Sequence, residues 1–344
     1  MIPQPDFLVR VSCMTYNHAP YIVDALNGFT MQETTFPFVC TVIDDASTDG
    51  EQEVIKAYLQ EHFDLEDKSV ARNEETDDYV LTFARHKTNQ NCYFAVLYLK
   101  YNHYSLKKSK QPYIQEWSNT KYVALCEGDD YWIDQKKLQM QVDIMNNNPG
   151  ITMCWHDAHK MSALTKEYKG GFQRYNKDTI CPTDDIILGG GDFCPTASLL
   201  YRKVIRDKAP EYLFSQYVGD YPLQIYMALS GKVYYINKKM SIYRVNVPGS
   251  WVSHSYDYSN IEKRKDTWPK EIKIYNDFNA FSGYKYNHAF KQREYKYMFY
   301  EMLRLGEYGL ARKYWYKIDI NKRLWNWKLV MYLHGIYILK KVFK

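Results

Sequence analysis

Apolar positions in the first part of the chain fall into continuous runs separated by stretches with helical spacing. The continuous runs at 8–14, 38–43 and 123–126 predict buried strands, because a short apolar run without alternation is typical of a strand covered on both faces. Apolar residues recur three and four positions apart at 21–29 and 54–63, which predicts two helices. This order predicts an α/β fold with a mostly parallel sheet flanked by helices.

Weaker patterns continue the chain beyond these elements. We expect a helix at 94–108 and strands at 151–155 and 196–201, whereas 161–191 has little periodicity and predicts a long binding loop. Strand patterns stop after about residue 256.

The remaining residues have helical spacing. Residues 286–317 predict two helices separated at Gly306. We therefore expect an α/β domain at 1–255 and a C-terminal helical region at 256–344.

Composition narrows the class of protein. A mean hydropathy of -0.54 excludes a polytopic membrane protein, and residues 1–10 do not have the pattern of a signal peptide. The seven cysteines lie mostly inside apolar runs without paired spacing, which favours buried free thiols over disulfides. These features predict a cytoplasmic location.

The net charge of +5 is concentrated in the tail. Residues 312–344 carry nine Lys or Arg and one acid, so their balance is +8 and that of the remaining chain is +5 − 8 = −3. Tryptophan and tyrosine between these basic residues suit either a helix on the inner face of the plasma membrane or a helix docked on the body. A nucleic-acid partner is not expected, because the charge gathers in the tail rather than at a site.

Polar residues follow four of the expected elements. They lie at 15–18, 44–49, 127–130 and 219–220. In a parallel sheet, the ligand site lies at the carboxyl ends of the strands. Among these clusters, Glu127-Gly128-Asp129 places two carboxylates two positions apart, which suits a divalent cation completed by substrate phosphates. An acidic cluster at a helix start is the alternative.

In this order, the motifs resemble those of the inverting family 2 glycosyltransferases of the GT-A fold, of the bacterial surface-polysaccharide type. The matching segments are Ser12-Cys-Met-Thr-Tyr-Asn-His18, Asp44-Asp-Ala-Ser-Thr-Asp-Gly50, Arg85 with Asn89, Glu127-Gly-Asp-Asp-Tyr-Trp132, Gly219-Asp220 and Tyr243-Arg244. The resemblance covers about residues 8–252. It departs from the family pattern at Glu127, where the family has Asp, at Asn91, where it has Gly, and at Asn246, where many members have His.

The resemblance implies a metal-dependent transferase that moves a sugar from a nucleotide sugar, such as a UDP-sugar, to a hydroxyl of a glycan or lipid-linked glycan. Asp220 would be the general base, and Mn²⁺ or Mg²⁺ the cofactor. The implied nucleotide-sugar residues are Thr15, Tyr16, Asn17, Asp44, Asp45, Arg85, Asn89, Gly128, Tyr243 and Arg244. The implied metal ligands are Glu127 and Asp129 with Asn246 or His254, and the implied acceptor residues are Asp130, Trp132, His156 and Trp251.

Alternatives remain for the whole chain and for single residues. A sugar-nucleotide nucleotidyltransferase also combines a parallel sheet with a metal-bound nucleotide, and a non-catalytic glycan-binding protein is the non-enzyme alternative. Asp44 and Asp220 could cap helices, and Arg244 could form a structural ion pair. Trp132 is more typical of packing than of a sugar platform.

Overall fold

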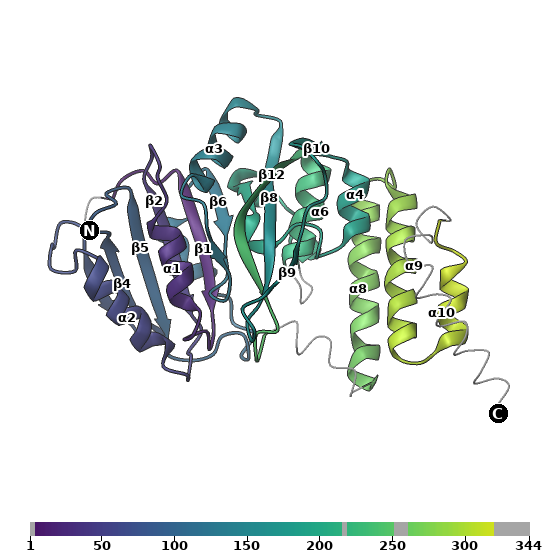
Figure 1. Ribbon diagram of the computed structural model, residues 1–344, viewed down its shortest axis with the longest axis horizontal. Helices are drawn as coiled ribbons and strands as arrows, with labels where there is room; N and C mark the ends of the chain where they lie inside the picture. The colour runs from purple at the N-terminus through teal and green to yellow at the C-terminus, as the bar shows by residue number, and fades with distance from the viewer. Residues whose placement is uncertain (1–3, 215–218, 251–260, 320–344) are drawn as a thin grey trace. The chain divides into compact units, whose positions relative to one another are not determined.

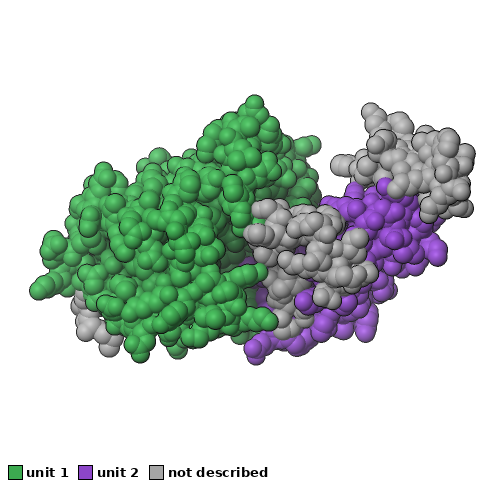
Figure 2. All heavy atoms as spheres, turned by 90° about the horizontal axis from the view of Figure 1, so that it is seen from below, with its two compact units in different colours: residues 1–181, 191–209, 227–253 green, residues 182–190, 210–226, 254–344 purple. Residues whose placement is uncertain are grey.

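The computed structural model describes residues 4–214, 219–250 and 261–319. Its residues cluster into two compact units (Figure 2). The first unit contains 1–181, 191–209 and 227–253, and the second contains 182–190, 210–226 and 254–344. Two segments from the expected α/β domain therefore belong to the second unit.

The first unit is built on one large sheet (Figure 1). The strand order is β10-β12-β8-β11-β6-β1-β2-β5-β4-β3, with β7 paired to β12 and β9 to β8. The strands are β1 Val9–Thr15, β2 Phe38–Asp44, β3 Arg72–Glu75, β4 Tyr79–Arg85, β5 Cys92–Leu99, β6 Tyr122–Leu125, β7 Tyr131–Trp132, β8 Ile151–Ser162, β9 Tyr168–Gly171, β10 Thr179–Cys181, β11 Leu200–Arg202 and β12 Lys232–Val245.

Strands β6, β1, β2 and β5 form a parallel core in this sheet. Every residue of β2 and β5 is buried, as the continuous apolar runs require of strands covered on both faces. The expected mostly parallel α/β sheet is thus confirmed in its centre, while β3, β4, β9, β10 and β11 pair antiparallel with their neighbours.

Different elements cover the two faces of the parallel core. On one face, Phe29 of α1 and Leu59 of α2 join the same apolar cluster as Cys40 of β2. On the other, Val39 packs in a cluster with Trp117 of the 3₁₀ helix η1. The helices of this unit are α1 Ile22–Thr30, α2 Glu51–His62, α3 Lys137–Asn147 and α5 Lys203–Arg206, with the 3₁₀ helices η1 Gln111–Trp117 and η2 Thr196–Ser198.

Two expectations for single elements were wrong, and a third was wrong in part. Residues 94–108 do not form a helix, because 92–99 form β5 and the chain then turns into a loop. The expected strand at 196–201 is η2 followed by β11. The stretch 161–191 is not one long loop, because it contains β9, β10 and the helix α4.

The seven cysteines are all free and buried. Most of them lie in the strands of the sheet, as at Cys13 in β1, Cys40 in β2 and Cys92 in β5. The expectation of buried free thiols is confirmed.

The second unit is helical. It contains α4 Thr183–Gly189, the 3₁₀ helix η3 Glu211–Phe214, the start of α6 Asp220–Ser230, and α8 Ile261–Phe281, α9 Asn287–Arg304 and α10 Tyr308–Trp315. The helix pair expected at 286–317, with its break at Gly306, is confirmed by α9 and α10. None of the helices in the described ranges is long and apolar enough to cross a membrane. Residues 320–344, which hold most of the basic tail, lie outside the described residues.

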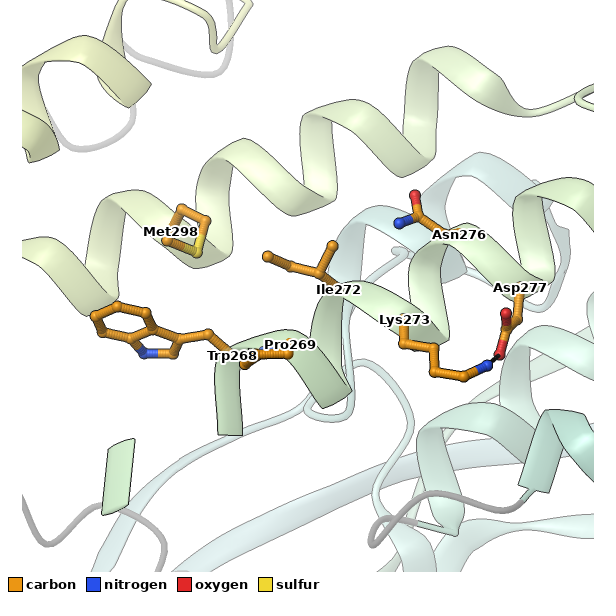
Figure 3. Close-up of a pocket in the computed structure, with 7 residues that line it drawn as sticks. All are labelled: Trp268, Pro269, Ile272, Lys273, Asn276, Asp277 and Met298. Carbon is orange, nitrogen blue, oxygen red and sulfur yellow. Dashed lines mark hydrogen bonds and ion pairs between the residues drawn. The ribbon is translucent and has the colours of Figure 1, made fainter. Parts of the chain in front are cut away.

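A shallow pocket lies on the second unit, between α8 and α9 (Figure 3). Trp268, Ile272 and Met298 supply its apolar lining, and Lys273 is paired with Asp277 at its end. None of the residues implied by the sequence motifs lines this pocket, so the candidate site lies elsewhere.

Candidate functional site

The first three polar clusters meet at one edge of the parallel core. Thr15 and Asp44 are register partners at the carboxyl ends of β1 and β2. The backbone of Asp45 donates to the carbonyl of Thr15 at 3.0 Å, and that of Gly128 donates to the carbonyl of Met14 at 3.1 Å. The sheet therefore brings together the 15–18, 44–49 and 127–130 segments, as expected for strands that end at the same edge.

Asp44 is a buried carboxylate that is only half satisfied. Its Oδ1 accepts hydrogen bonds from the Ser47 backbone at 3.1 Å and from Gln52 Nε2 at 2.6 Å. Its Oδ2 has no hydrogen-bond partner among the described residues. Burial raises the pKa of the Asp44 carboxyl above its usual range. Such an unpaired acceptor is suited to a ligand that offers an N–H or O–H group.

The neighbouring Asp45 is fully engaged by the protein. Its carboxylate accepts from the backbone of His103 at 2.7 Å and of Tyr104 at 3.0 Å, and it pairs with Lys110 Nζ at 3.0 Å. These contacts hold the loop after β5 against the end of β2. Both oxygens of Asp45 therefore have partners within the protein.

The 15–18 segment is joined to the start of α2 through Glu51. This carboxylate is buried, and it accepts hydrogen bonds from the Thr15 hydroxyl, the His18 backbone at 2.9 Å and the Ser47 hydroxyl at 2.8 Å. Burial raises the pKa of the Glu51 carboxyl, although its three donors oppose the shift.

Asn17 adds a second connection between the same two segments. It has a positive φ of 56°, a conformation that asparagine adopts more readily than most residues. Its backbone donates to Ser47 Oγ at 2.9 Å, and its side-chain oxygen accepts from the backbone of Thr48 at 2.8 Å. The adjacent Tyr16 is 43% exposed at the edge of this turn.

The acidic turn after β6 contains one exposed, one half-buried and one buried carboxylate. Glu127 is exposed, Asp129 is half-buried, and Asp130 is buried. Burial, and next the charge of Asp129, raise the pKa of the Asp130 carboxyl well above its usual range. Gly128 packs so closely on β1 that an added Cβ would lie 2.1 Å from Thr15 Oγ1. The turn is therefore fixed against the first strand.

Arg244 also binds the acidic turn at 127–130, in addition to the contact of that turn with β1. Its backbone donates to Asp130 Oδ1 at 2.8 Å, and its Nη1 donates to the carbonyl of Asp129 at 2.6 Å. Its Nη2 pairs with Asp24 of α1, which agrees with the structural ion-pair interpretation. Burial, and then the three acids of the turn, raise the pKa of Tyr243, whose phenol lies in the field of these acids.

Two residues near the site were not predicted from the sequence. The His18 ring lies with its Nε2 3.9 Å from Asp129 Oδ2 and its Nδ1 3.2 Å from Thr15 Oγ1. The sequence pattern marks Glu51 only as the start of a helix, although it supports both loops. His18 belongs to the polar cluster that follows β1, and that position was the available signal.

Two residues implied to bind the acceptor are buried in the core. Trp132 is 1% exposed, and its Nε1 donates to the carbonyl of Ala197 at 2.7 Å. His156 is fully buried, and its Nδ1 bonds to the carbonyl of Asp157 at 2.7 Å. Both side chains are thus enclosed by the protein in this structure, as the packing alternative for Trp132 expects. Asp130, also implied there, is buried as part of the acidic turn.

The structure does not bring Arg85 and Asn89 to this edge. Because β4 runs antiparallel to β5, Arg85 lies where β5 and β2 begin, at the opposite edge of the parallel core. It pairs with Asp64 at 3.5 Å, and Asn89 Nδ2 donates to the carbonyls of Thr30 and Gln32. In this structure both residues therefore make their described contacts away from the edge at which the three polar clusters meet.

The remaining implied residues lie in the second unit, at the end of β12 or beyond the described ranges. Asp220 is the first residue of α6, and its Oδ1 accepts from the backbone of Tyr221 at 2.8 Å. Asn246 follows β12, is exposed and has a positive φ of 62°. Trp251 and His254 lie outside the described residues.

The described ranges contain no group of three or more His, Cys, Asp or Glu residues that would hold a metal ion by itself. A cation at the acidic turn would therefore take part of its coordination from a ligand or from water, which is usual for Mg²⁺-type sites.

Comparison with known proteins supports the fold. No family model matches the chain. Uncharacterized protein Rv1520 of Mycobacterium tuberculosis and Uncharacterized protein Mb1547 of Mycobacterium bovis are each 28% identical to it over 249 residues. The match covers 71% of this chain and 61% of each relative, so the chain spans less than two thirds of their length.

Among solved structures, the chain is similar to S. aureus TarS 1–349. The complex of TarS with UDP-GlcNAc superposes with a TM-score of 0.52 at 14% identity, covering 92% of this chain and 77% of that one. The complex with UDP gives a TM-score of 0.50, covering 92% and 76%. The fold is that of the GT-A type, with a large sheet flanked by helices and a C-terminal helical region.

Proposed function

We propose that this chain is an inverting, metal-dependent glycosyltransferase of family 2, which transfers a hexosyl or acetamidohexosyl group from a UDP-sugar to a hydroxyl of a glycan or lipid-linked glycan. The observation that carries the proposal is Asp44. Its buried Oδ2 has no partner among the described residues, and β2 ends at the carboxyl edge of the parallel core, one strand away from β6 and the acidic turn that follows it. The N–H of a uracil ring is a donor that would satisfy this oxygen.

The fold and its neighbours support the same substrate class. The solved TarS structures with the same fold are complexes with UDP and UDP-GlcNAc. In open α/β sheets, ligands bind outside the carboxyl ends of the strands, where Thr15, Asn17 and Asp44 lie. We therefore propose that Asp44 binds the nucleoside and that the loop containing Thr15 and Asn17 contacts the rest of the nucleotide.

The acidic turn fits a divalent cation. Asp129 would supply carboxylate oxygens to the cation directly and Glu127 through a water molecule, and carboxylate oxygens are the donors that Mg²⁺ and Mn²⁺ prefer. Gly128 lets the turn approach Thr15 closer than any residue with a Cβ would allow. When bound, the cation would neutralise charge on the departing diphosphate.

Asp220 is the proposed general base. Its carboxylate would take the proton of the acceptor hydroxyl, whose oxygen then attacks the anomeric carbon on the face opposite the nucleotide. The bond between that carbon and the diphosphate oxygen breaks, and its electron pair leaves with the nucleotide. Attack from the opposite face inverts the anomeric configuration.

The acceptor proposal follows from the resemblance to surface-polysaccharide enzymes. We propose a role in building a cell-envelope glycan, such as a capsule or lipopolysaccharide precursor. The basic aromatic tail would place the enzyme on the inner face of the plasma membrane, where lipid-linked acceptors are presented.

A screen of nucleotide sugars tests the proposal. The full chain is incubated with each donor, with and without Mn²⁺, and release of the nucleoside diphosphate is measured. We expect activity with a UDP-sugar that depends on the metal. If no donor is consumed under any condition, the proposed function is wrong.

Asp220→Asn tests the base separately. A positioned base contributes roughly 10²–10⁴-fold, so transfer should fall by that factor while UDP affinity stays unchanged. Asp184→Asn, at the exposed first turn of α4, is the matched control. Transfer near the wild-type rate in Asp220→Asn would remove Asp220 from the mechanism and leave the donor class standing.

A further inference from the structure

The geometry around His18 points to a further ligand of the proposed cation. We propose that His18 Nε2 is the second protein ligand beside Asp129, the place for which the sequence offered Asn246 or His254. This inference rests on the proposed function, because it assumes a cation at the acidic turn.

The first step of the argument is distance. His18 Nε2 lies 3.9 Å from Asp129 Oδ2, and both side chains are 15% exposed. Ligand atoms lie about 2.0–2.2 Å from small divalent cations, so two ligands of one ion are about 3–4.3 Å apart. The observed separation falls within this range.

The second step is the direction of the hydrogen bonds on the other side of the ring. Thr15 has one hydroxyl hydrogen, and it donates this hydrogen to the Glu51 carboxylate. With the Glu51 carboxylate ionised, the Thr15 oxygen is left to accept from His18, whose Nδ1 is 3.2 Å away. The Nδ1 atom therefore carries a hydrogen, and Nε2 is the nitrogen that can offer a lone pair toward Asp129.

The third step is the support behind Thr15. Glu51 is buried, and it also accepts from the His18 backbone at 2.9 Å and from Ser47 Oγ at 2.8 Å. The chain from Glu51 through Thr15 to His18 thus fixes both the ring and its tautomer. Metal-binding histidines are typically held in this way by a carboxylate or another acceptor on the far nitrogen.

The backbone at Gly128 packs against the His18 imidazole and fixes its position. An added Cβ at Gly128 would lie 3.1 Å from His18 Nδ1 and 2.1 Å from Thr15 Oγ1. The ring is therefore packed against the backbone of the acidic turn, directly beside the carboxylate of Asp129.

An imidazole ligand also has a consequence for metal preference. Mg²⁺ strongly favours oxygen ligands, whereas imidazole nitrogen binds later first-row metals well. A site made of Asp129 and His18 should bind Mn²⁺ more tightly than Mg²⁺, and removal of the imidazole should reduce that ratio.

Pulsed electron paramagnetic resonance of Mn²⁺ bound to the full chain with UDP tests this assignment. The wild type should show nitrogen modulation from a coordinated imidazole. His18→Ala should lose it and bind Mn²⁺ at least about 10-fold more weakly, because a ligand has been removed. His254→Ala and His288→Ala, the latter an exposed histidine of α9, should keep the signal.

Further variants protect the test against misfolding. His18→Gln keeps a polar side chain of similar reach, and it should lose the nitrogen signal while the far-ultraviolet circular dichroism stays that of the wild type. Thr15→Val keeps the imidazole but removes the hydroxyl that connects Glu51 to His18 Nδ1. It should weaken Mn²⁺ binding about 10- to 100-fold.

The outcomes separate this inference from the proposed function. Bound Mn²⁺ without nitrogen modulation, or modulation that persists in His18→Ala, overturns the role of His18 and leaves the transferase proposal intact. If the wild type binds UDP but no Mn²⁺, both the His18 ligand and the metal requirement are wrong. Donor turnover by a wild type that binds no metal in the presence of UDP likewise overturns the role of His18.

Discussion

At the residue scale, the half-satisfied carboxylate of Asp44 gives the sharpest prediction. In Asp44→Asn, the amide oxygen can still accept from Ser47 and Gln52, while an N–H group replaces the unpaired Oδ2. A donor would then face the donor group of the ligand. We expect UDP affinity, measured by calorimetry, to fall about 10- to 100-fold.

Asp64→Asn is the matched control for this change. Asp64 pairs with Arg85 at the opposite edge of the parallel core, so its loss should leave UDP affinity unchanged. Equal UDP affinity in Asp44→Asn and the wild type would mean that Asp44 Oδ2 does not contact the nucleotide.

Lys137 gives a prediction for pH dependence. It is fully buried against Trp132 with its Nζ bonded to Gln141 Oε1 at 2.8 Å, and burial lowers its pKa to about 7. The unfolded amine titrates at about 10.4, so the unfolded state binds more protons between about pH 7 and pH 10.4. The free energy of unfolding should therefore rise with pH across this window.

Lys137→Met removes this linkage. Its stabilising effect should be largest near pH 7 and should shrink by about 1.4 kcal/mol per pH unit toward pH 10. Urea denaturation at pH 7, 8 and 9 measures the difference, with the exposed Lys136→Met as control. A constant difference between Lys137→Met and the wild type would show that Lys137 titrates alike in both states.

At this scale, the sequence indicates which residues stand at strand ends but not how accessible they are. Thr15 and Asp44 end β1 and β2, and Asp129 lies in the turn after β6, so all three stand where neighbouring parallel strands end. Trp132 and His156 stand equally close to the motifs, yet both are covered by segments distant in sequence, such as the one containing Ala197. Burial by segments distant in sequence cannot be predicted from the local pattern of apolar and polar residues.

At the element scale, the acidic turn depends on Gly128. In Gly128→Ala, the new methyl group would clash with the Thr15 side chain and crowd His18. We expect a loss of about 1–3 kcal/mol in the free energy of unfolding, because the turn and β1 must move apart. UDP binding should weaken as well, since the same movement shifts Thr15.

Gly150→Ala provides the comparison. No atom lies within 4 Å of a Cβ placed at this glycine. The free energy of unfolding of Gly150→Ala should therefore stay within about 0.5 kcal/mol of the wild type. Chemical denaturation of both variants measures these two free energies of unfolding. Equal stability of the two would show that the turn has room for a side chain at Gly128.

Element type was predictable where the apolar pattern had one period, and less so elsewhere. The runs that became β1 and β2 were identified as strands. The stretch 92–99 is equally apolar, but a fully buried strand and a buried helix cannot be told apart by periodicity alone. The expected helix was also extended into the loop that Asp45 holds, which depends on contacts 58 and 59 residues apart.

At the scale of the whole molecule, the tail gives a prediction for location. Residues 312–344 carry a balance of +8 with interspersed aromatic residues. If this charge binds anionic lipid, the full chain should sediment with vesicles containing anionic phospholipid and be released at high salt. Deletion of 320–344 should abolish the sedimentation, whereas equal sedimentation without these residues would exclude the tail as the anchor.

The division into two units was only partly visible in the sequence. The loss of strand patterns near residue 256 marks the start of the long helical segment of the second unit. The assignment of 182–190 and 210–226 to that unit depends on long-range packing, such as the hydrogen bond from Tyr221 to the carbonyl of Ile187. Asp220 thus comes from a different unit than Asp44 and Asp129.

Because all seven thiols are buried, the native cysteines should not react with a thiol-specific label, and an introduced cysteine can be labelled selectively. A maleimide spin label should react with a cysteine introduced at exposed Glu33 in the first unit and another at exposed Tyr284 in the second, and leave the native cysteines unmodified. The distance between the two labels would then report how the units are arranged in solution, and whether UDP changes that arrangement.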